Sequence, residues 1–232
     1  MKRNITKRLS RWLAVAMLAV APASAVGQTQ IMLETEMGNI RLKLNDEEAP
    51  LHSKNFRTLV EQGFYDGLLF HRLAKNFVIQ AGDPNSKDAE PGVLLGDTQE
   101  PYTVPAEIDY PRLMHKRGAL CMAREGDDVN PERASSAYQF YIVYGRKFDE
   151  EALNKMQARL DDTTGGQVKL TPEVRKTYKT VGGLPHLDGQ YTVFGEVVDG
   201  LDVVKRIQMV DADENGRPLT DVRILRAYVC EK

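Results

Sequence analysis

The segment Phe70–Pro84, with the sequence FHRLAKNFVIQAGDP, constrains the fold and function of this chain more than any other stretch. It is an apolar segment that carries one arginine, Arg72, and one glutamine, Gln80, and it ends in a Gly-Asp-Pro turn. A buried guanidinium is costly unless its donors are satisfied, so this pattern indicates a concave apolar site with one placed donor. The alternative is an edge strand whose Arg72 points into water, because long charged side chains are mostly exposed.

The first 25 residues have the three-part layout of a secretory signal peptide. Met1–Arg11 carries five basic residues and no acid, Trp12–Ala21 is apolar, and Ala23-Ser24-Ala25 is a small-residue cleavage site. The apolar run is too short for a stop-transfer helix, although an uncleaved N-terminal anchor is the alternative. We therefore expect cleavage after Ala25, a periplasmic or secreted protein, and no stable membrane insertion after signal cleavage.

The rest of the chain is acidic. Five of the 31 Lys and Arg residues and none of the 33 Asp and Glu residues lie in residues 1–25, so the remainder carries 26 basic and 33 acidic residues, a net charge of −7. This balance argues against a nucleic-acid partner, which would need clustered basic charge. We expect residues 26–232 to form one domain with an insertion, and we expect a monomer because no coiled-coil repeat is evident.

The cysteines and histidines give no sign of metal or nucleophile chemistry. Cys121 and Cys230 lie in apolar, strand-like runs without a CxxC motif or a Cys/His ligand spacing. They either pair in an oxidising compartment or remain buried thiols, and both alternatives stay open. His115 and His186 lack a Ser, Cys or Asp at a spacing that indicates a hydrolase triad. The sequence therefore predicts no metal site and no cofactor.

Short strands over the whole chain, with short helices near both ends, predict a mainly antiparallel closed β-barrel capped by helices. The helix at 49–62 follows the acidic triplet Asp46–Glu48, which suits the positive end of its dipole, and we expect its His52 to be exposed to solvent. Strands or extended segments are expected at 30–36, 40–44, 70–84 (two strands), 102–108, 119–123, 139–144, 190–198 and 222–230, polar loops at 84–101 and 125–136, and a second capping helix at 201–208.

Residues 148–183 change from a strand pattern to a helical one. Apolar residues share one helical face between positions 153 and 160, and Thr171-Pro172 is a good N-cap and first helical position. Gly182-Gly183 ends the second helix. This predicts an inserted helical hairpin whose apolar stripes serve packing.

Five blocks in chain order resemble the motifs of the cyclophilins, the peptidyl-prolyl cis-trans isomerases. They are Phe70-His71-Arg72, Phe77–Pro84, Gly118–Ala123, Gln139–Ile142, and Leu187-Asp188-Gly189 with Val193-Phe194-Gly195. One block alone would be weak evidence, whereas five in the right order are specific. They cover the chain after residue 25 except the inserted helices and the polar loops, and the resemblance is to the bacterial, exported members.

The resemblance implies a closed eight-stranded barrel with a helix over each end and an active site on its outer face. By motif position, Arg72 is the catalytic arginine and Gln80 is the amide beside it. The expected substrate-binding residues are Phe77, Val78, Tyr141, Leu187 and Tyr191 for the proline ring, and Ala123, Arg124 and Gln139 for the substrate backbone.

Four departures from the family pattern bear on this site. Arg124 stands where many members have asparagine, and a backbone contact survives that change more readily than a side-chain contact. His186 replaces a tryptophan common in eukaryotic members, and Tyr191 replaces a histidine but can still line an apolar pocket. Tyr138 puts bulk near the site where the family usually has serine.

The resemblance implies an enzyme that accelerates X-Pro bond rotation in proline-containing polypeptide clients during the folding of exported proteins. The alternative is a proline-peptide binding or chaperone module with little turnover. Retention of Arg72, Gln80 and Tyr141 favours the enzyme, whereas Tyr138 and the insertion favour the alternative. Because the insertion lies between the strand of Tyr141 and the turn of Leu187, we expect it to flank the site and to limit which clients enter.

Overall fold

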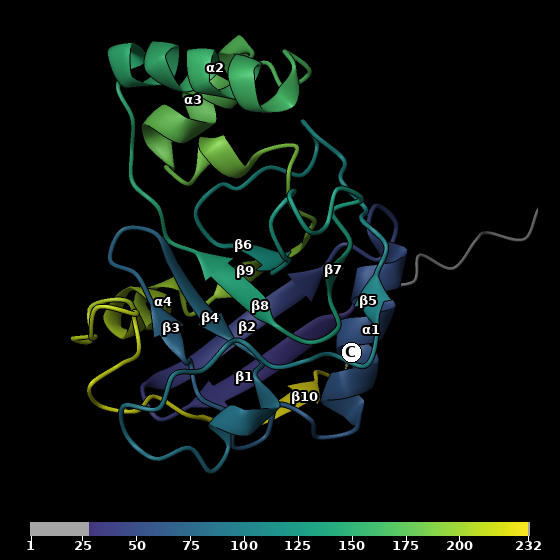
Figure 1. Ribbon diagram of the computed structural model, residues 1–232, viewed down its shortest axis with the longest axis vertical. Coiled ribbons are helices and arrows are strands. Elements are labelled where there is room, and N and C mark those ends of the chain that lie inside the picture. The colour runs from purple at the N-terminus through teal and green to yellow at the C-terminus, as the bar shows by residue number, and fades with distance from the viewer. Residues whose placement is uncertain (1–27, 232) are drawn as a thin grey trace, which may run out of the picture.

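The computed structural model describes residues 28–231, which form a curled, eight-stranded antiparallel sheet with four α-helices (Figure 1). In sheet order the strands are β10 (Ile224–Val229), β1 (Gln30–Thr35), β2 (Gly38–Leu44), β9 (Val193–Asp199), β6 (Ala119–Met122), β8 (Phe140–Val143), β4 (Val78–Ala81) and β3 (Arg72–Leu73). A separate two-stranded sheet joins β5 (Thr103–Val104) to β7 (Ser135–Ser136), and β7 lies in a segment expected to be a loop.

The helices are α1 (Pro50–Glu61), α2 (Glu150–Thr164), α3 (Pro172–Thr180) and α4 (Leu201–Ile207), with short 3-10 turns at η1 (Pro84–Ser86) and η2 (Pro185–Leu187). Within residues 28–231, every helix is too short or too polar to cross a bilayer.

The sheet is an open half-barrel, which corrects the expected closed barrel. Its two edge strands, β3 and β10, do not pair with each other. The two-residue β3 is too short to continue the ladder, and the Leu73 N–H donates instead to the Gly216 carbonyl (2.7 Å) in the loop before β10. An isolated bridge between Leu69 and Arg223 spans the opening beside these edges, together with backbone hydrogen bonds from the Phe70 N–H to the Val222 carbonyl (2.9 Å) and from the Ile224 N–H to the Leu68 carbonyl (2.8 Å).

Alternation along the strands separates two apolar clusters on opposite faces of the sheet. The main core contains Ile79, Phe140 and Ile142, and α1 and α4 pack over it as the expected capping helices. Phe56 of α1, for example, lies 5.2 Å from the Phe140 ring. The outer cluster, defined by Val78, Ala119, Cys121, Tyr141, Val143, Leu184 and Val193, lies on the opposite face. Strands β4, β6 and β8 are therefore buried on both faces, which explains their continuous apolar sequences.

The cysteines are both free thiols, with Cys121 buried in the outer cluster and Cys230 partly buried. The sequence left open whether the two cysteines form a disulfide or remain thiols, and in the structure they remain thiols.

The insertion forms the predicted helical hairpin, α2 and α3, at one end of the molecule beyond β6, β8 and β9 (Figure 1). It has a small core of its own, which Tyr110 and Met114 from the loop before β6 help to close. Asp149 caps α2 by accepting from the Ala152 N–H (2.8 Å), and Thr171 is the N-cap of α3 as predicted. The insertion is thus a packed unit with defined helix ends.

The start of α1 differs from the prediction. The carboxylate of Glu107 accepts from the N–H groups of Leu51 and His52 (2.9 Å each) and from His52 Nδ1 (2.6 Å). Asp46 of the acidic triplet accepts from the Thr29 N–H instead. His52, which was expected to be exposed, is fully buried. More than fifty residues separate Glu107 from the first turn of the helix, so local sequence spacing could not reveal this cap.

Replacing Glu107 with alanine is expected to lower the free energy of unfolding by about 1–3 kcal/mol, because two helix N–H groups and a buried imidazole lose their acceptor. Urea denaturation measures the change. Glu47→Ala, in the exposed part of the acidic triplet, is the matched control and should stay within about 0.5 kcal/mol. Equal losses in the two variants would contradict this account of the helix start.

A second buried histidine, His71, directly precedes Arg72. Its side chain is 3% exposed, and neither ring nitrogen has a hydrogen-bond partner within the described part of the chain. Burial lowers the pKa of His71 to about 4, against a smaller opposing effect of the Asp83 carboxylate. His71 is therefore neutral in the folded protein at pH 7.

Stability is expected to fall as the pH drops from 6.5 towards 4, because the unfolded chain protonates His71 near pH 6.5 whereas the folded chain does so only near pH 4. Between pH 6.5 and 5, where carboxylates titrate little, this histidine should account for a loss of about 1–2 kcal/mol. His71→Gln should reduce that slope in urea titrations at each pH, while the part due to His186, whose pKa burial also lowers to about 4, remains. An unchanged slope in the folded variant would show that His71 is not the group responsible.

Candidate active site

Strand pairing brings the candidate residues into one row across the sheet. Gln80 on β4 lies opposite Arg72 on β3 and opposite Tyr141 on β8, and Tyr141 lies opposite Cys121 on β6. Directly opposed residues of antiparallel strands share a face. The row therefore lies on the face of the outer cluster, and Gln80 neighbours both the candidate catalytic arginine and the pocket wall.

Arg72 is a partly buried cation on an edge strand. Its guanidinium carbon lies 5.9 Å from the centre of the Phe77 ring. Arg124 and Arg133 are ion-paired, whereas Arg72 has no ion-pair partner within residues 28–231. The edge-strand alternative was thus right about the strand, but Arg72 lies against an apolar wall and is not fully exposed. Its donors remain available to a ligand.

A chain of amides holds Gln80 in place. Its Nε2 donates to Gln139 Oε1 (3.2 Å), and Gln139 Nε2 donates to the Gly96 carbonyl (3.0 Å). The Gly96 N–H in turn donates to the carboxylate of Asp83 (2.6 Å), which belongs to the Gly-Asp-Pro turn of the opening motif. Gln139 is only 5% exposed. The turn therefore orients both amides of the candidate site.

The residues expected to bind the proline ring all belong to the outer cluster or pack against it. Val78 and Tyr141 are buried, whereas Phe77, Leu187 and Tyr191 are partly exposed. Tyr141 meets Tyr191 edge to face at 6.2 Å. Together these side chains form an apolar surface with exposed rims, which suits a small aliphatic ring.

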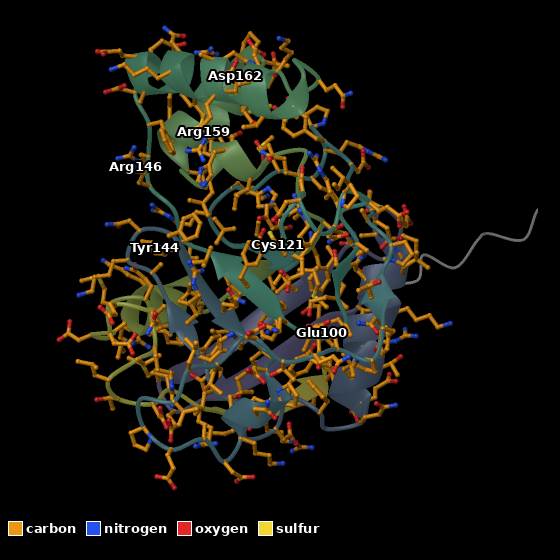
Figure 2. All side chains as sticks on the ribbon, viewed as in Figure 1. Glu100, Cys121, Tyr144, Arg146, Arg159 and Asp162 are labelled. Atoms are coloured by element: carbon orange, nitrogen blue, oxygen red, sulfur yellow. The ribbon has the colours of Figure 1, made fainter. Side chains whose placement is uncertain are left out.

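His186 covers one side of this surface, because its ring stacks on Phe77 at 5.8 Å. Burial lowers the pKa of His186 to about 4, and the charges of Arg159 and Arg146 act in the same direction. Figure 2 shows Arg146 on the segment that leads into the insertion and Arg159 on α2. The neutral imidazole extends the apolar wall where many family members have tryptophan.

In the segment expected to bind the substrate backbone, Ala123 and Arg124 already make hydrogen bonds within the protein. The Ala123 N–H donates to the Gln139 carbonyl (2.9 Å), and the Ala123 carbonyl accepts from the Ser136 N–H (2.8 Å). The Arg124 guanidinium lies over Tyr191 (4.4 Å) and donates to the Gln190 carbonyl (2.8 Å). The side chain that replaces asparagine is therefore used to hold Tyr191.

An open groove of about 670 Å³ adjoins this segment and is lined by Gln80, Ala123, Arg124 and Gln139 among others. It continues over the acidic residues Asp97, Glu100, Glu125 and Glu132. The groove thus borders the amide side of the candidate site, while the surface expected to bind proline lies beyond Gln80. Within residues 28–231, no His, Cys, Asp and Glu side chains cluster as a metal site would require.

Tyr138 does not obstruct this groove. It is 6% exposed, belongs to the main core, and packs its ring 5.2 Å from Phe64. The bulk that the sequence placed near the site is therefore directed to the other face of the sheet. This finding removes one of the two features that favoured a binding module with little turnover.

The insertion borders the candidate site, as expected. Helix α2 packs against η2, the turn that carries Leu187. Its effect on client choice stays a prediction.

Sequence reasoning missed three buried polar residues behind the pocket. Tyr178, Asp188 and His115 form a hydrogen-bonded chain that ends on Tyr141. His115 and Asp188 are 73 residues apart, so no local spacing connects them. The one available signal was that Asp188 lies in the Leu-Asp-Gly block.

The comparisons with known proteins agree with this site and fold. Residues 30–229 match the family model described as cyclophilin type peptidyl-prolyl cis-trans isomerase/CLD. Peptidyl-prolyl cis-trans isomerase-like 1 of Neurospora crassa is 32% identical over 202 residues, which is 87% of this chain and 94% of that protein. The mouse protein of the same name is 29% identical over 211 residues, 91% of this chain and 98% of that protein.

A solved structure supports the fold. The crystal structure of a cyclophilin type peptidyl-prolyl cis-trans isomerase from Cryptosporidium parvum has a TM-score of 0.62 and 22% sequence identity. The superposition covers 88% of this chain and 99% of the Cryptosporidium parvum chain.

The same comparisons correct two expectations. The relatives named here are eukaryotic and not periplasmic, which contradicts the expected periplasmic or secreted location and does not support a bacterial, exported form. The expected signal peptide and its cleavage after Ala25 lie outside the described residues. The location was inferred from those residues alone.

The family match spans most of the chain, and the named relatives share the isomerase activity in their names. The chain belongs to the cyclophilin family and is a peptidyl-prolyl cis-trans isomerase.

Proposed function

We propose that Arg72, assisted by Gln80, accelerates X-Pro bond rotation in proline-containing polypeptides by stabilising the twisted amide. The observation that carries this proposal is the cross-strand row of Arg72, Gln80 and Tyr141. This row sets a guanidinium that has no ion-pair partner in the described part of the chain beside the apolar outer cluster. The clients are polypeptide chains, because the open groove of about 670 Å³ beside Gln80 leaves room for residues next to the proline.

The reaction needs a well-placed donor more than a reactive group. Rotation about an X-Pro bond breaks amide resonance, with a barrier of about 18–20 kcal/mol for a peptide bond. Uncatalysed exchange therefore takes tens to hundreds of seconds. As the amide twists, its nitrogen loses conjugation and gains a lone pair. A fixed donor that bonds this nitrogen more strongly at the twist than in the planar state lowers the barrier.

Arg72 suits this role because its guanidinium is planar and always charged. The proline ring rests on Phe77, Tyr141 and Leu187 while the preceding carbonyl swings. These apolar side chains also exclude water that would stabilise charge separation in the planar amide. Gln80, held by Gln139, orients the substrate backbone beside the arginine.

Replacing Arg72 with alanine should lower kcat/KM for an Ala-Pro peptide by about 10²–10³, the effect expected from losing one preorganised donor. Arg72→Lys should recover part of the activity, because it keeps the charge but loses the planar fork. Exchange NMR on a proline peptide measures both.

Arg226→Ala is the matched control, because Arg226 also places its guanidinium over an aromatic ring, 5.0 Å from the centre of Tyr228, but on the exposed side of β10. This control should keep full activity. Near-normal turnover in a folded Arg72→Ala variant would exclude the proposed role, and slow turnover in the wild type with retained peptide binding would favour the binding module.

A further inference from the structure

We propose that the insertion positions the wall of the proline pocket through a buried hydrogen-bonded chain of Tyr178, Asp188, His115 and Tyr141. Tyr178, Asp188 and His115 are positioning residues, since they act on the substrate only through the Tyr141 ring. The inference rests on the placement of Tyr141 in the pocket under the proposed function. Under this proposal the insertion affects catalysis by positioning Tyr141, in addition to bordering the site.

The chain is centred on a carboxylate with no exposure to solvent. Asp188 accepts from the Tyr178 hydroxyl (2.6 Å), from the His115 backbone N–H (2.8 Å) and from His115 Nδ1 (3.1 Å). A buried carboxylate is costly unless hydrogen bonds satisfy it, and removing one donor leaves part of that cost uncompensated. Asp188 therefore ties the positions of Tyr178 and His115 to each other.

The carboxylate also determines which nitrogen of His115 carries the proton. Because Nδ1 faces the Asp188 carboxylate, which can only accept, Nδ1 carries a proton, and Nε2 is the nitrogen that bonds the Tyr141 hydroxyl (3.1 Å). The two rings are nearly parallel, with centres 6.3 Å apart. The hydroxyl of Tyr141 is thus held on the buried side, so the ring edge and face remain for the pocket.

The first member of the chain belongs to the insertion. Tyr178 lies on α3, is fully buried, and meets Phe148 edge to face at 6.3 Å inside the small core of the insertion. After α3 the polypeptide passes through Gly183, which packs closely against the His115 segment. A Cβ added at Gly183 would lie 2.2 Å from the His115 carbonyl oxygen. The Leu184 N–H donates to the same carbonyl (2.8 Å). Backbone and side-chain contacts therefore lock α3 to the His115 segment.

The decisive variant is Tyr178→Phe, which removes one hydroxyl and keeps the ring in the core of the insertion. Tyr110→Phe is the matched control, because the Tyr110 hydroxyl donates to the Lys169 carbonyl (2.8 Å) of the insertion without joining the chain. Exchange NMR on an Ala-Pro peptide gives kcat/KM, and ¹⁵N NMR of the His115 ring reports which nitrogen is protonated. Both are measured on the full chain.

We expect Tyr178→Phe to lower kcat/KM about 3- to 10-fold and to shift the His115 ring nitrogens and the Tyr141 ring resonances. Tyr110→Phe should leave all three readouts unchanged, with kcat/KM within twofold. Unchanged kinetics and unchanged Tyr141 resonances in a folded Tyr178→Phe protein would overturn the proposal. An equal loss in both variants would also overturn it, because it would show a general effect of loosening the insertion.

The ¹⁵N spectrum of the wild-type protein tests the hydrogen-bonded chain directly, even if the variant fails to fold. A His115 ring that carries a proton at Nδ1 is required, and a ring protonated at Nε2 alone would overturn the chain whatever the variants do. The Arg72→Ala comparison separates this inference from the proposed function. A slow Arg72→Ala enzyme with an unaffected Tyr178→Phe enzyme contradicts only the inference, whereas an unaffected Arg72→Ala enzyme contradicts the proposed function.

Discussion

The register of β4 between β3 and β8 is the constraint on which the site depends. Gln80 lies opposite both Arg72 and Tyr141, so the ladder that builds the sheet also aligns the donor with the pocket wall. A slip of one residue would exchange the faces of Ile79 and Gln80 and put an amide into the main core. Because these strands are buried on both faces, packing opposes that slip. The stability of the fold and the alignment of the site therefore have one physical origin.

Much of the architecture follows from local patterns in the sequence. The apolar runs at 119–123 and 139–144, the helix at 49–62 and the capped hairpin of the insertion all form where predicted. The apolar runs could not show which residues face the main core, because strands buried on both faces lack alternation. The pairing of β8 with β4 and β6 determines which residues face the main core. It places Tyr141 in the outer cluster and Phe140 in the main core.

What the sequence could not predict depends on contacts between distant segments. Glu107 reaches the start of α1 and buries His52, and Asp188 meets His115 across 73 residues. The open edge between β3 and β10 depends on the loop around Gly216. The pocket is likewise composite: the sheet supplies Arg72 and Gln80, whereas turns and the insertion hold Leu187 and the back of Tyr141. The sheet thus carries the proposed donor, and separate elements shape the surface proposed to bind the proline ring.

The most direct test of this account is to locate a proline ring on the protein by NMR. An isotope-labelled Ala-Pro peptide, observed while it exchanges on the enzyme, should show nuclear Overhauser contacts from its proline protons to Leu187 and Val78 methyl groups and to the Tyr141 ring. Cis–trans exchange accompanied by those contacts is the predicted result. Exchange with proline contacts on any other surface, or contacts here without exchange, would contradict the claim that the row of Arg72, Gln80 and Tyr141 forms the active site.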